Sequence, residues 1–271
     1  MRVATIGTPS PYEFFGTFAG LPFWRGGLTF IAAAPGIGKT SWLLRMVFEA
    51  SAAKIPAVVG CFDHTEEEMN FRLTQQAKAL IAGPHGPVTE AMSQDKLAEC
   101  SEAVLLALDD TRDTVRSFEE TLLKEYQFPQ KGPALVGMDY LNRIPVVGLT
   151  GMLPLASRSG DAAIELRNLG RRRDWAIISP VTLKPESFHK ENWDLDDLEG
   201  DGRAPYIADR VMIITRMDRP RACGCLNIRV HTIKDRTGPI LTRDMQFWGE
   251  RFYPALQHEF DPHLFPLIEE G

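Results

Sequence analysis

The sequence lacks a long apolar run. Its apolar stretches are strand-sized and are interrupted by glycine, proline or charged residues. A transmembrane helix needs about 20 consecutive apolar residues, so we expect none in this chain. The N-terminus also lacks a basic segment followed by a long apolar core, which is the pattern of a secretory signal peptide. We therefore expect a cytoplasmic protein with no membrane partner.

Cysteine is scarce, with 4 residues in the chain of 271. These residues are too few and too scattered for a disulfide framework. Cys223 and Cys225 are close enough to suggest zinc, but a tetrahedral site needs four ligands, and no second pair of Cys or His at a matching spacing accompanies them. We interpret the segment 219–225 as the tip of a hairpin.

The sequence has no excess of basic residues: 30 Lys and Arg against 36 Asp and Glu give a formal net charge of −6. This balance argues against a surface that coats itself with nucleic acid. A nucleic-acid channel is still compatible with it, since each subunit of a ring can contribute a few basic groups to one inner surface. With 44% hydrophobic and 24% charged residues, the chain has the composition of a globular protein and is long enough for one large domain.

The segment 28–46, LTFIAAAPGIGKTSWLLRM, has the pattern of a strand, a phosphate loop and a helix. The backbone N–H groups of such a loop, together with the positive end of the following helix, form a concave anion site. Lys39 supplies a mobile charge for the outer phosphates, and the Thr40 hydroxyl is expected to coordinate Mg²⁺. The usual motif begins with glycine, whereas this chain has Ala33. The predicted nucleotide-binding residues are Ala34, Pro35, Gly36, Ile37, Gly38, Lys39, Thr40 and Ser41.

Two carboxylates follow predicted buried strands. Asp63 follows the strand 56–62, in the loop at its carboxyl end, where open α/β sheets bind ligands. It could act as a general base for water or cap the helix predicted at 66–81, for which Thr65 and Glu68 form a capping box. Asp139 ends the strand 134–138 and is predicted to hold Mg²⁺ through water, although an Asp that starts a turn is the alternative.

The remaining pattern predicts an α/β fold. Further helices are expected at 40–53, 88–102, 113–126 and 160–173, and further strands at 104–108 and 175–179, the last closed by Pro180. A polar, acidic segment, 181–204, follows. Strands at 210–216, 226–234, 241–247 and 251–253 predict antiparallel hairpins beside the sheet. We divide the chain into an aromatic and Pro-rich N-terminal arm (1–26), a core (27–256) and a C-terminal tail (257–271). The arm could cover its own domain or bind a neighbouring subunit or a partner protein.

Several motifs occur together in one order: GGLTFIAAAPGIGKTS, CFDHTEEEMNFRL, LVGMDYLNRI, DLEGDGRAPYIADRVMII and IKDRTGP. In this set the chain resembles the ATPase domain of the DnaB-type replicative helicases, within the larger RecA-like family, over residues 19–253. That family also commonly has Ala in place of the first glycine of the phosphate loop. The resemblance implies a RecA-like P-loop NTPase fold with a mostly parallel central sheet, and we expect the family's N-terminal helical domain to be absent.

The resemblance also implies roles for particular residues. Lys39 and Thr40 would bind phosphate and Mg²⁺, Asp139 would hold the metal, and Asp63 would take the place of the family's water-activating Glu. Lys234 and Arg236 would reach the γ-phosphate of ATP bound on the neighbouring subunit, as an arginine finger does. The implied cofactors are ATP and Mg²⁺. The implied partners are further copies of the chain, in a ring (a hexamer) or a filament, and single-stranded DNA.

Two substitutions separate the chain from that family. Asp63 is one methylene shorter than Glu, and Pro180 stands after Ser179, where the family has a Gln that senses the γ-phosphate. The first functional hypothesis is an ATP-hydrolysing motor on single-stranded nucleic acid, of the kind found in mobile elements, phages or accessory systems. The alternative is an ATP-controlled assembly module that recruits a partner protein, which Pro180, Asp63, the acidic residues of 186–201 and the aromatic arm favour. A degenerate ATP binder is the third.

Overall fold

The computed structural model describes residues 14–18, 20–98, 103–146, 158–217 and 225–256. Within these residues nine strands form one sheet in the order β11-β10-β9-β8-β3-β7-β6-β4-β5. The strands from β8 to β5 in this order run parallel to one another, while β9, β10 and β11 are antiparallel to their neighbours. Their bounds are β3 Leu28–Ala33, β4 Ala57–Cys61, β5 Ala103–Ala107, β6 Leu135–Asp139, β7 Ala176–Thr182, β8 Arg210–Arg216, β9 Cys225–Asp235, β10 Thr242–Trp248 and β11 Tyr253–Ala255. The predicted α/β class with an antiparallel C-terminal extension is confirmed.

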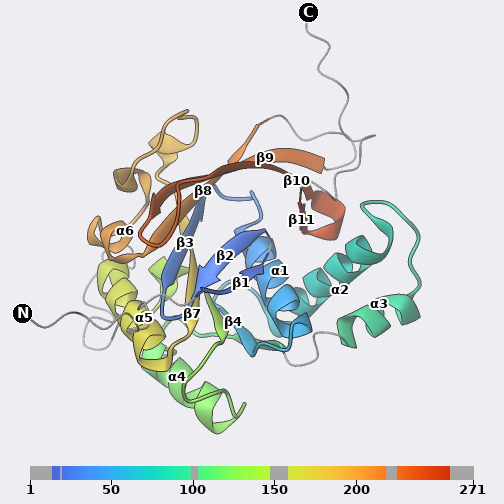
Figure 1. Ribbon diagram of the computed structural model, residues 1–271, viewed down its shortest axis with the longest axis horizontal. Coiled ribbons are helices and arrows are strands. Elements are labelled where there is room, and N and C mark those ends of the chain that lie inside the picture. Colours follow the sequence, from blue (N-terminus) through green and yellow to red (C-terminus); the bar gives the residue numbers. More distant parts are fainter. Residues whose placement is uncertain (1–13, 19, 99–102, 147–157, 218–224, 257–271) are drawn as a thin grey trace, which may run out of the picture.

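Helices cover both faces of this sheet (Figure 1). The helices are α1 Lys39–Ala52, α2 Glu66–Ala82, α3 Glu90–Ala98, α4 Val115–Lys124, α5 Ser159–Arg173 and α6 Arg203–Ile207, with single 3₁₀ turns η1 Leu141–Arg143, η3 Pro185–Ser187, η4 Leu195–Asp197 and η5 Gly249–Arg251. One hydrophobic cluster packs α1 and α2 against the sheet, and a second packs α4 and α5 on the other face. Along β3, Ile31 contributes to the first cluster and Phe30 to the second, as the alternation of a strand requires.

Local sequence explains how α2 begins. The Thr65 hydroxyl accepts a hydrogen bond from the Glu68 N–H at 3.2 Å, and the Glu68 carboxylate accepts one from the Thr65 N–H at 2.9 Å. This pair is the predicted capping box, and it satisfies two backbone donors that a helix start leaves unpaired. The helix α2 therefore begins shortly after the carboxyl end of β4, and Asp63 lies in the short loop between them.

Pro180 does not close its strand, and the prediction that it does is wrong. β7 runs through Pro180 to Thr182, and Pro180 lies opposite Ile31 of β3. Along β7 the N–H groups alternate between the two neighbouring strands: that of Ala176 donates to Ala134 O, and that of Ile177 to Gly27 O. The same alternation directs the backbone nitrogen of residue 180 toward β6, where proline has no hydrogen to donate.

The Ser179 side chain supplies the missing donor. Its hydroxyl donates to Met138 O at 2.8 Å, just beyond the last β6–β7 pair, Gly137 with Ile178. A buried carbonyl without a donor is costly, so this bond allows proline inside a central strand. The strand can therefore continue toward the loop that follows β3.

We expect Ser179→Ala to lower the free energy of unfolding by about 1–2 kcal/mol, because Met138 O then loses its donor. In a Pro180→Ala background the same change should cost less, since the residue 180 N–H can replace the hydroxyl. Urea unfolding of the four proteins in this cycle measures the coupling. If Ser179→Ala lowers the free energy of unfolding equally in both backgrounds, the Ser179 hydroxyl does not replace the missing N–H of residue 180.

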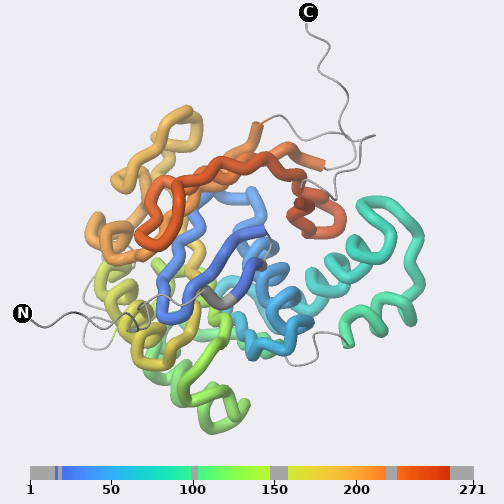
Figure 2. The backbone as a smooth tube through the Cα atoms, viewed as in Figure 1, coloured from blue at the N-terminus to red at the C-terminus, as the bar shows by residue number. Residues whose placement is uncertain are grey.

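The described part of the N-terminal arm packs on its own domain. β1 (Phe14–Phe18) and β2 (Leu21–Trp24) form an antiparallel hairpin beside α1 (Figure 2). Leu21 and Phe23 are buried in the cluster that contains α1, and the Arg210 guanidinium lies 4.3 Å from the centre of the Trp24 ring. The interpretation that the arm covers its own domain therefore fits residues 14–24.

Some expectations lie outside the described residues. These concern the first part of the arm, the tip around Cys223 and the tail 257–271. In the part of the chain that the structure describes, no helix is long and apolar enough to cross a membrane.

Candidate nucleotide-binding site

The loop between β3 and α1 contains two glycines in the left-handed backbone region. Gly36 and Gly38 have φ values of 80° and 93°, which residues with a side chain rarely adopt. A Cβ on Gly38 would also lie 2.7 Å from the Phe247 ring. The two glycines are therefore required by backbone conformation, and at Gly38 by close packing as well.

A cavity of about 460 Å³ opens beside this loop. Of the predicted nucleotide-binding residues, six line it: Pro35, Gly36, Gly38, Lys39, Thr40 and Ser41. Ala34 and Ile37 line a neighbouring cavity instead, together with Leu183 and Phe188. Asp63 and Asp139 also line the cavity beside the loop, so the structure brings both predicted carboxylates to the phosphate loop.

Lys39 is held by the loop itself. Its Nζ donates to Ala33 O at 3.0 Å and to Ala34 O at 3.3 Å. Burial lowers its pKa, and the carboxylates of Asp139, Glu199 and Asp63 oppose that effect. A half-buried ammonium whose hydrogen bonds go to two neutral carbonyls can move to an anion that offers stronger, charge-assisted hydrogen bonds.

Thr40 and Asp139 form the oxygen-rich corner of the cavity. The Thr40 hydroxyl donates to Asp139 Oδ2 at 2.6 Å, and Asp139 is only 3% exposed. Burial raises the pKa of Asp139, and the hydrogen bond from Thr40 opposes that effect. Mg²⁺ prefers oxygen ligands, and a hydroxyl and a carboxylate in contact provide them, so Thr40 and Asp139 fit the predicted metal. Among the described residues there is no group of three or more His, Cys, Asp or Glu that could hold a metal by itself.

Asp63 faces the cavity from the loop after β4. Thr65 is the N-cap of α2, whereas Asp63 contacts Arg143, with 3.3 Å between Arg143 Nη2 and Asp63 Oδ1. Arg143 also donates to the Tyr140 hydroxyl at 3.3 Å and to Asp110 Oδ2 at 2.6 Å. These two hydrogen bonds raise the pKa of the Arg143 guanidinium. The candidate base is thus paired with a permanent cation beside the phosphate loop.

The cavity wall includes residues that were not predicted as site residues: His64, Arg72, Tyr140, Thr182, Phe247, Gly249 and Phe252. Arg72 lies over the Phe252 ring at 5.2 Å. Arg72 stands in the motif CFDHTEEEMNFRL, which was the available signal for it. Phe247 and Phe252 are about 200 residues from the loop in sequence, so no local pattern places them there. Thr182 lies two residues beyond Pro180, at the end of β7.

Lys234 and Arg236 lie away from this cavity. Lys234 pairs with Val211 of β8, which pairs with Phe30, and the Arg236 N–H donates to Asp209 O, level with Leu28. They are therefore at the amino end of β3, whereas the phosphate loop follows its carboxyl end, roughly 17 Å along the strand. The structure does not bring these two predicted residues together with the other site residues of the same chain.

Both cations are held by the end of α6. Lys234 Nζ donates to Pro205 O and Tyr206 O, each at 2.8 Å, and Arg236 Nη2 donates to Tyr206 O at 2.7 Å. Burial lowers the pKa of Lys234 to about 8, and the positive charges of Arg236 and Arg167 contribute. This end of the domain therefore carries crowded positive charge.

Comparisons with known proteins bear on the family and the fold of the chain. The family model for the DnaB-like helicase C-terminal domain matches residues 17–253. A solved structure described as an ATPase domain matches with a TM-score of 0.69 and 19% identity, over 86% of this chain and 85% of that chain. A structure of a DnaB-like replicative helicase, described with its interactions with primase, matches with a TM-score of 0.70 and 19% identity, over 86% of this chain and 59% of that chain.

No curated protein sequence matches the chain significantly. At this identity the solved structures establish the fold alone, a RecA-like α/β domain with a large, mostly parallel sheet. The family model covers most of the sequence and is independent of that structural likeness. The chain belongs to the family of DnaB-like helicase C-terminal domains.

Proposed function

We propose that the chain is an ATP-hydrolysing, Mg²⁺-dependent motor domain that assembles with further copies of itself and acts on single-stranded nucleic acid. The observation that carries this proposal is the separation of two charged sites. Lys39, Thr40, Asp63 and Asp139 meet at one end of β3, and Lys234 and Arg236 lie at the other. One copy therefore offers a nucleotide site and a cationic group that cannot serve the same nucleotide.

Four side chains of the cavity, those of Lys39, Thr40, Asp63 and Asp139, have specific tasks in this proposal. Lys39 exchanges its two carbonyl partners for the outer phosphates, and the loop N–H groups donate to the phosphate oxygens. Thr40 and Asp139 would hold Mg²⁺, which neutralises the charge that develops on the phosphates. Asp63 orients the attacking water, through a second water if the shorter side chain does not reach. Arg143 holds this carboxylate in place.

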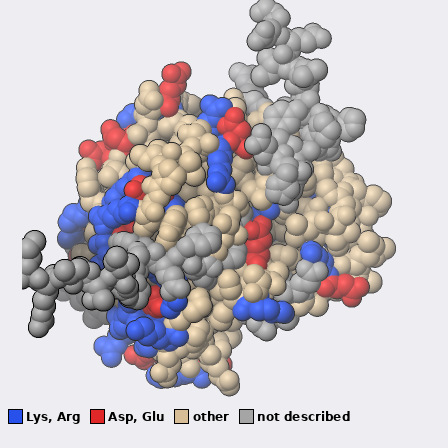
Figure 3. Space-filling model, in the orientation of Figure 1, with Lys and Arg blue, Asp and Glu red and all other residues tan. Residues whose placement is uncertain are grey.

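Lys234 and Arg236 would complete the site of a neighbouring copy. Lys234, Arg236 and Arg167 surround the Asp209 carboxylate at this end of the domain. Lys and Arg gather on the side of the molecule where α5 and α6 lie (Figure 3). A γ-phosphate presented by a neighbour is the anion that such a cluster would stabilise during transfer. Head-to-tail contact between copies leads to a ring, which we propose to be a hexamer, or to a filament.

The nucleic-acid part is tested by measuring ATP hydrolysis and binding with single-stranded DNA. We expect the DNA to stimulate hydrolysis, and its affinity to fall steeply as salt increases, because phosphate contacts release counterions. Heparin of equal charge serves as a control for unspecific polyanion binding and should not stimulate turnover. If the DNA neither binds at low salt nor stimulates hydrolysis, action on DNA is refuted. The same assay with RNA shows which of the two nucleic acids the protein acts on.

The alternative is an ATP-controlled assembly module that recruits a partner protein. Pro180 favours it, because this position in β7 offers neither a side-chain amide nor an N–H for coupling nucleotide to nucleic acid. One of the similar helicases is described with its interactions with primase, and the N-terminal arm is our proposed contact for such a partner in this chain. Size measurement with and without ATP decides between the two functions: assembly on ATP without DNA affinity selects this alternative.

A further inference from the structure

The Asp209 carboxylate is close to Lys234 and Arg236, the two proposed cross-subunit cations. It is 4% exposed, follows α6 and precedes β8. Its Oδ2 accepts a hydrogen bond from the Leu28 N–H at 3.0 Å, so the first residue of β3 fixes its orientation. Oδ1 accepts from Arg167 Nη2 at 2.9 Å and from Arg236 Nη1 at 3.3 Å. One buried oxygen is thus shared by two guanidinium groups.

The two arginines differ in burial and in the element that carries them. Arg167 projects from α5, and its side chain is 21% exposed. Arg236 follows the end of β9, and its side chain is 39% exposed. The shorter bond also belongs to Arg167. Arg167 is therefore the fixed partner of Asp209, and Arg236 is the one that can leave.

Leaving a buried carboxylate without a cation is expensive. For Arg236 to reach a phosphate on the neighbouring copy, its bond to Asp209 must break, and Asp209 must remain neutralised while it is broken. We propose that Arg167 is a positioning residue for the cross-subunit Arg236: it shares Asp209 so that Arg236 can exchange that carboxylate for the neighbour's phosphate. This inference rests on the proposed function, because it assumes that Arg236 acts on the neighbouring nucleotide.

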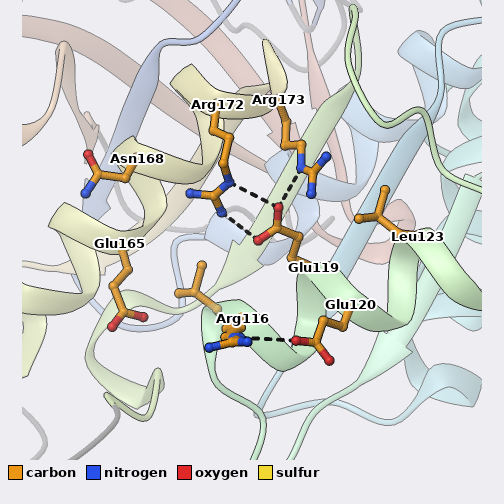
Figure 4. A pocket seen from close by; sticks show the side chains of 9 residues that line it. Arg116, Glu119, Glu120, Leu123, Glu165, Asn168, Arg172 and Arg173 are labelled. Carbon is orange, nitrogen blue, oxygen red and sulfur yellow. Dashed lines mark hydrogen bonds and ion pairs between the residues drawn. The ribbon is translucent and has the colours of Figure 1, made fainter.

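The same helix offers a matched comparison. Near the end of α5, Arg172 and Arg173 share the Glu119 carboxylate of α4, at 2.6 Å from Arg172 Nη2 and 2.6 Å from Arg173 Nε (Figure 4). Glu119 is buried, and these side chains border a groove of about 620 Å³. Removing Arg172 takes away one of two guanidinium groups on a buried carboxylate, as removing Arg167 does, but it does so away from Lys234 and Arg236.

We expect Arg167→Met to lower kcat for ATP by about tenfold with KM nearly unchanged, the size of one charge-assisted hydrogen bond. Arg167→Lys, which keeps a cation near Asp209, should restore most of the turnover. Arg172→Met should turn over like the unmodified protein. Unchanged kcat in Arg167→Met would overturn the proposal.

Mixing subunits separates positioning from folding. Arg167→Met subunits keep an intact nucleotide site, and Asp139→Ala subunits keep an intact Arg236 with its Arg167. Turnover per Arg167→Met subunit should therefore rise severalfold when Asp139→Ala protein is added in excess, at concentrations where both assemble. No rise, together with a lowered melting temperature, would show that Arg167 only supports the fold, and would overturn the proposal.

Failure of the proposed function itself gives a different result. If Arg236→Ala protein hydrolyses ATP as fast as the unmodified protein, Arg236 does not act on the neighbouring nucleotide, and the inference falls with that function. If Arg236→Ala abolishes turnover while Arg167→Met does not reduce it, only the role of Arg167 is refuted.

Discussion

Arg236→Ala protein is expected to bind ATP nearly as well as the unmodified chain but to hydrolyse it about a thousandfold more slowly. The reason is geometric: Arg236 is level with Leu28 at the amino end of β3, far from the Lys39 of its own chain. Nucleotide binding therefore should not depend on it, whereas charge stabilisation on the neighbouring copy should. Fluorescent-nucleotide titration and steady-state hydrolysis measure the two quantities.

Arg229 provides the matched control for this change. It lies on β9, the strand that Arg236 follows, its side chain is 39% exposed like that of Arg236, and it pairs with Asp244 of β10 at 2.8 Å. Arg229→Ala should keep full turnover. In mixtures, Asp139→Ala subunits should restore hydrolysis at Arg236→Ala sites, because each variant supplies the group that the other lacks. If no mixture recovers activity, Arg236 does not act across the interface.

Lys39→Ala is expected to lower hydrolysis by about a thousandfold and also to weaken ATP binding, because in the proposed function Lys39 binds the phosphates of the nucleotide on its own chain. The fold should not suffer. Burial lowers the pKa of Lys39, which means that the folded protein disfavours its charge, so removing the ammonium should leave the free energy of unfolding at neutral pH equal or higher.

Lys124 is a suitable control for this second change. It is 72% exposed on α4 and pairs only at the surface with Glu120 at 3.3 Å, where an ion pair contributes little. Lys124→Ala should therefore change neither binding nor turnover. A Lys39→Ala protein that hydrolyses ATP normally would remove the phosphate loop from the mechanism. A large loss of stability would instead show that Lys39 supports the loop.

The parts of the fold that local sequence determines could be predicted. The phosphate loop follows from its two required glycines and from Lys39, and the start of α2 follows from Thr65 and Glu68, which bond to each other. Asp63 and Asp139 could be placed because parallel strands bring their carboxyl ends to one edge of a sheet. These features depend on a few neighbouring residues or on the direction of a strand.

Features that depend on contacts distant in sequence could not be predicted. Pro180 reads locally as the end of a strand, and only the Ser179 hydroxyl on Met138 O, which is 41 residues away, allows the strand to continue. Phe247 reaches Gly38 of the phosphate loop because its strand, β10, pairs with β11, which contacts α1. The shared Asp209 likewise joins α5, β3 and the end of β9, and no sequence pattern links these segments.

The two charged sites lie at opposite ends of β3, so in the proposed function each copy has a polarity, with an acceptor end that would hold nucleotide and a donor end that would complete the next site. In a closed ring every acceptor meets a donor, so all sites are equivalent. In an open filament one terminal copy holds a nucleotide that no donor serves. Hydrolysis per copy would then continue to increase as filaments lengthen, whereas it would stay constant once all copies are in closed rings, so turnover measured above the assembly concentration reports whether the assembly is closed.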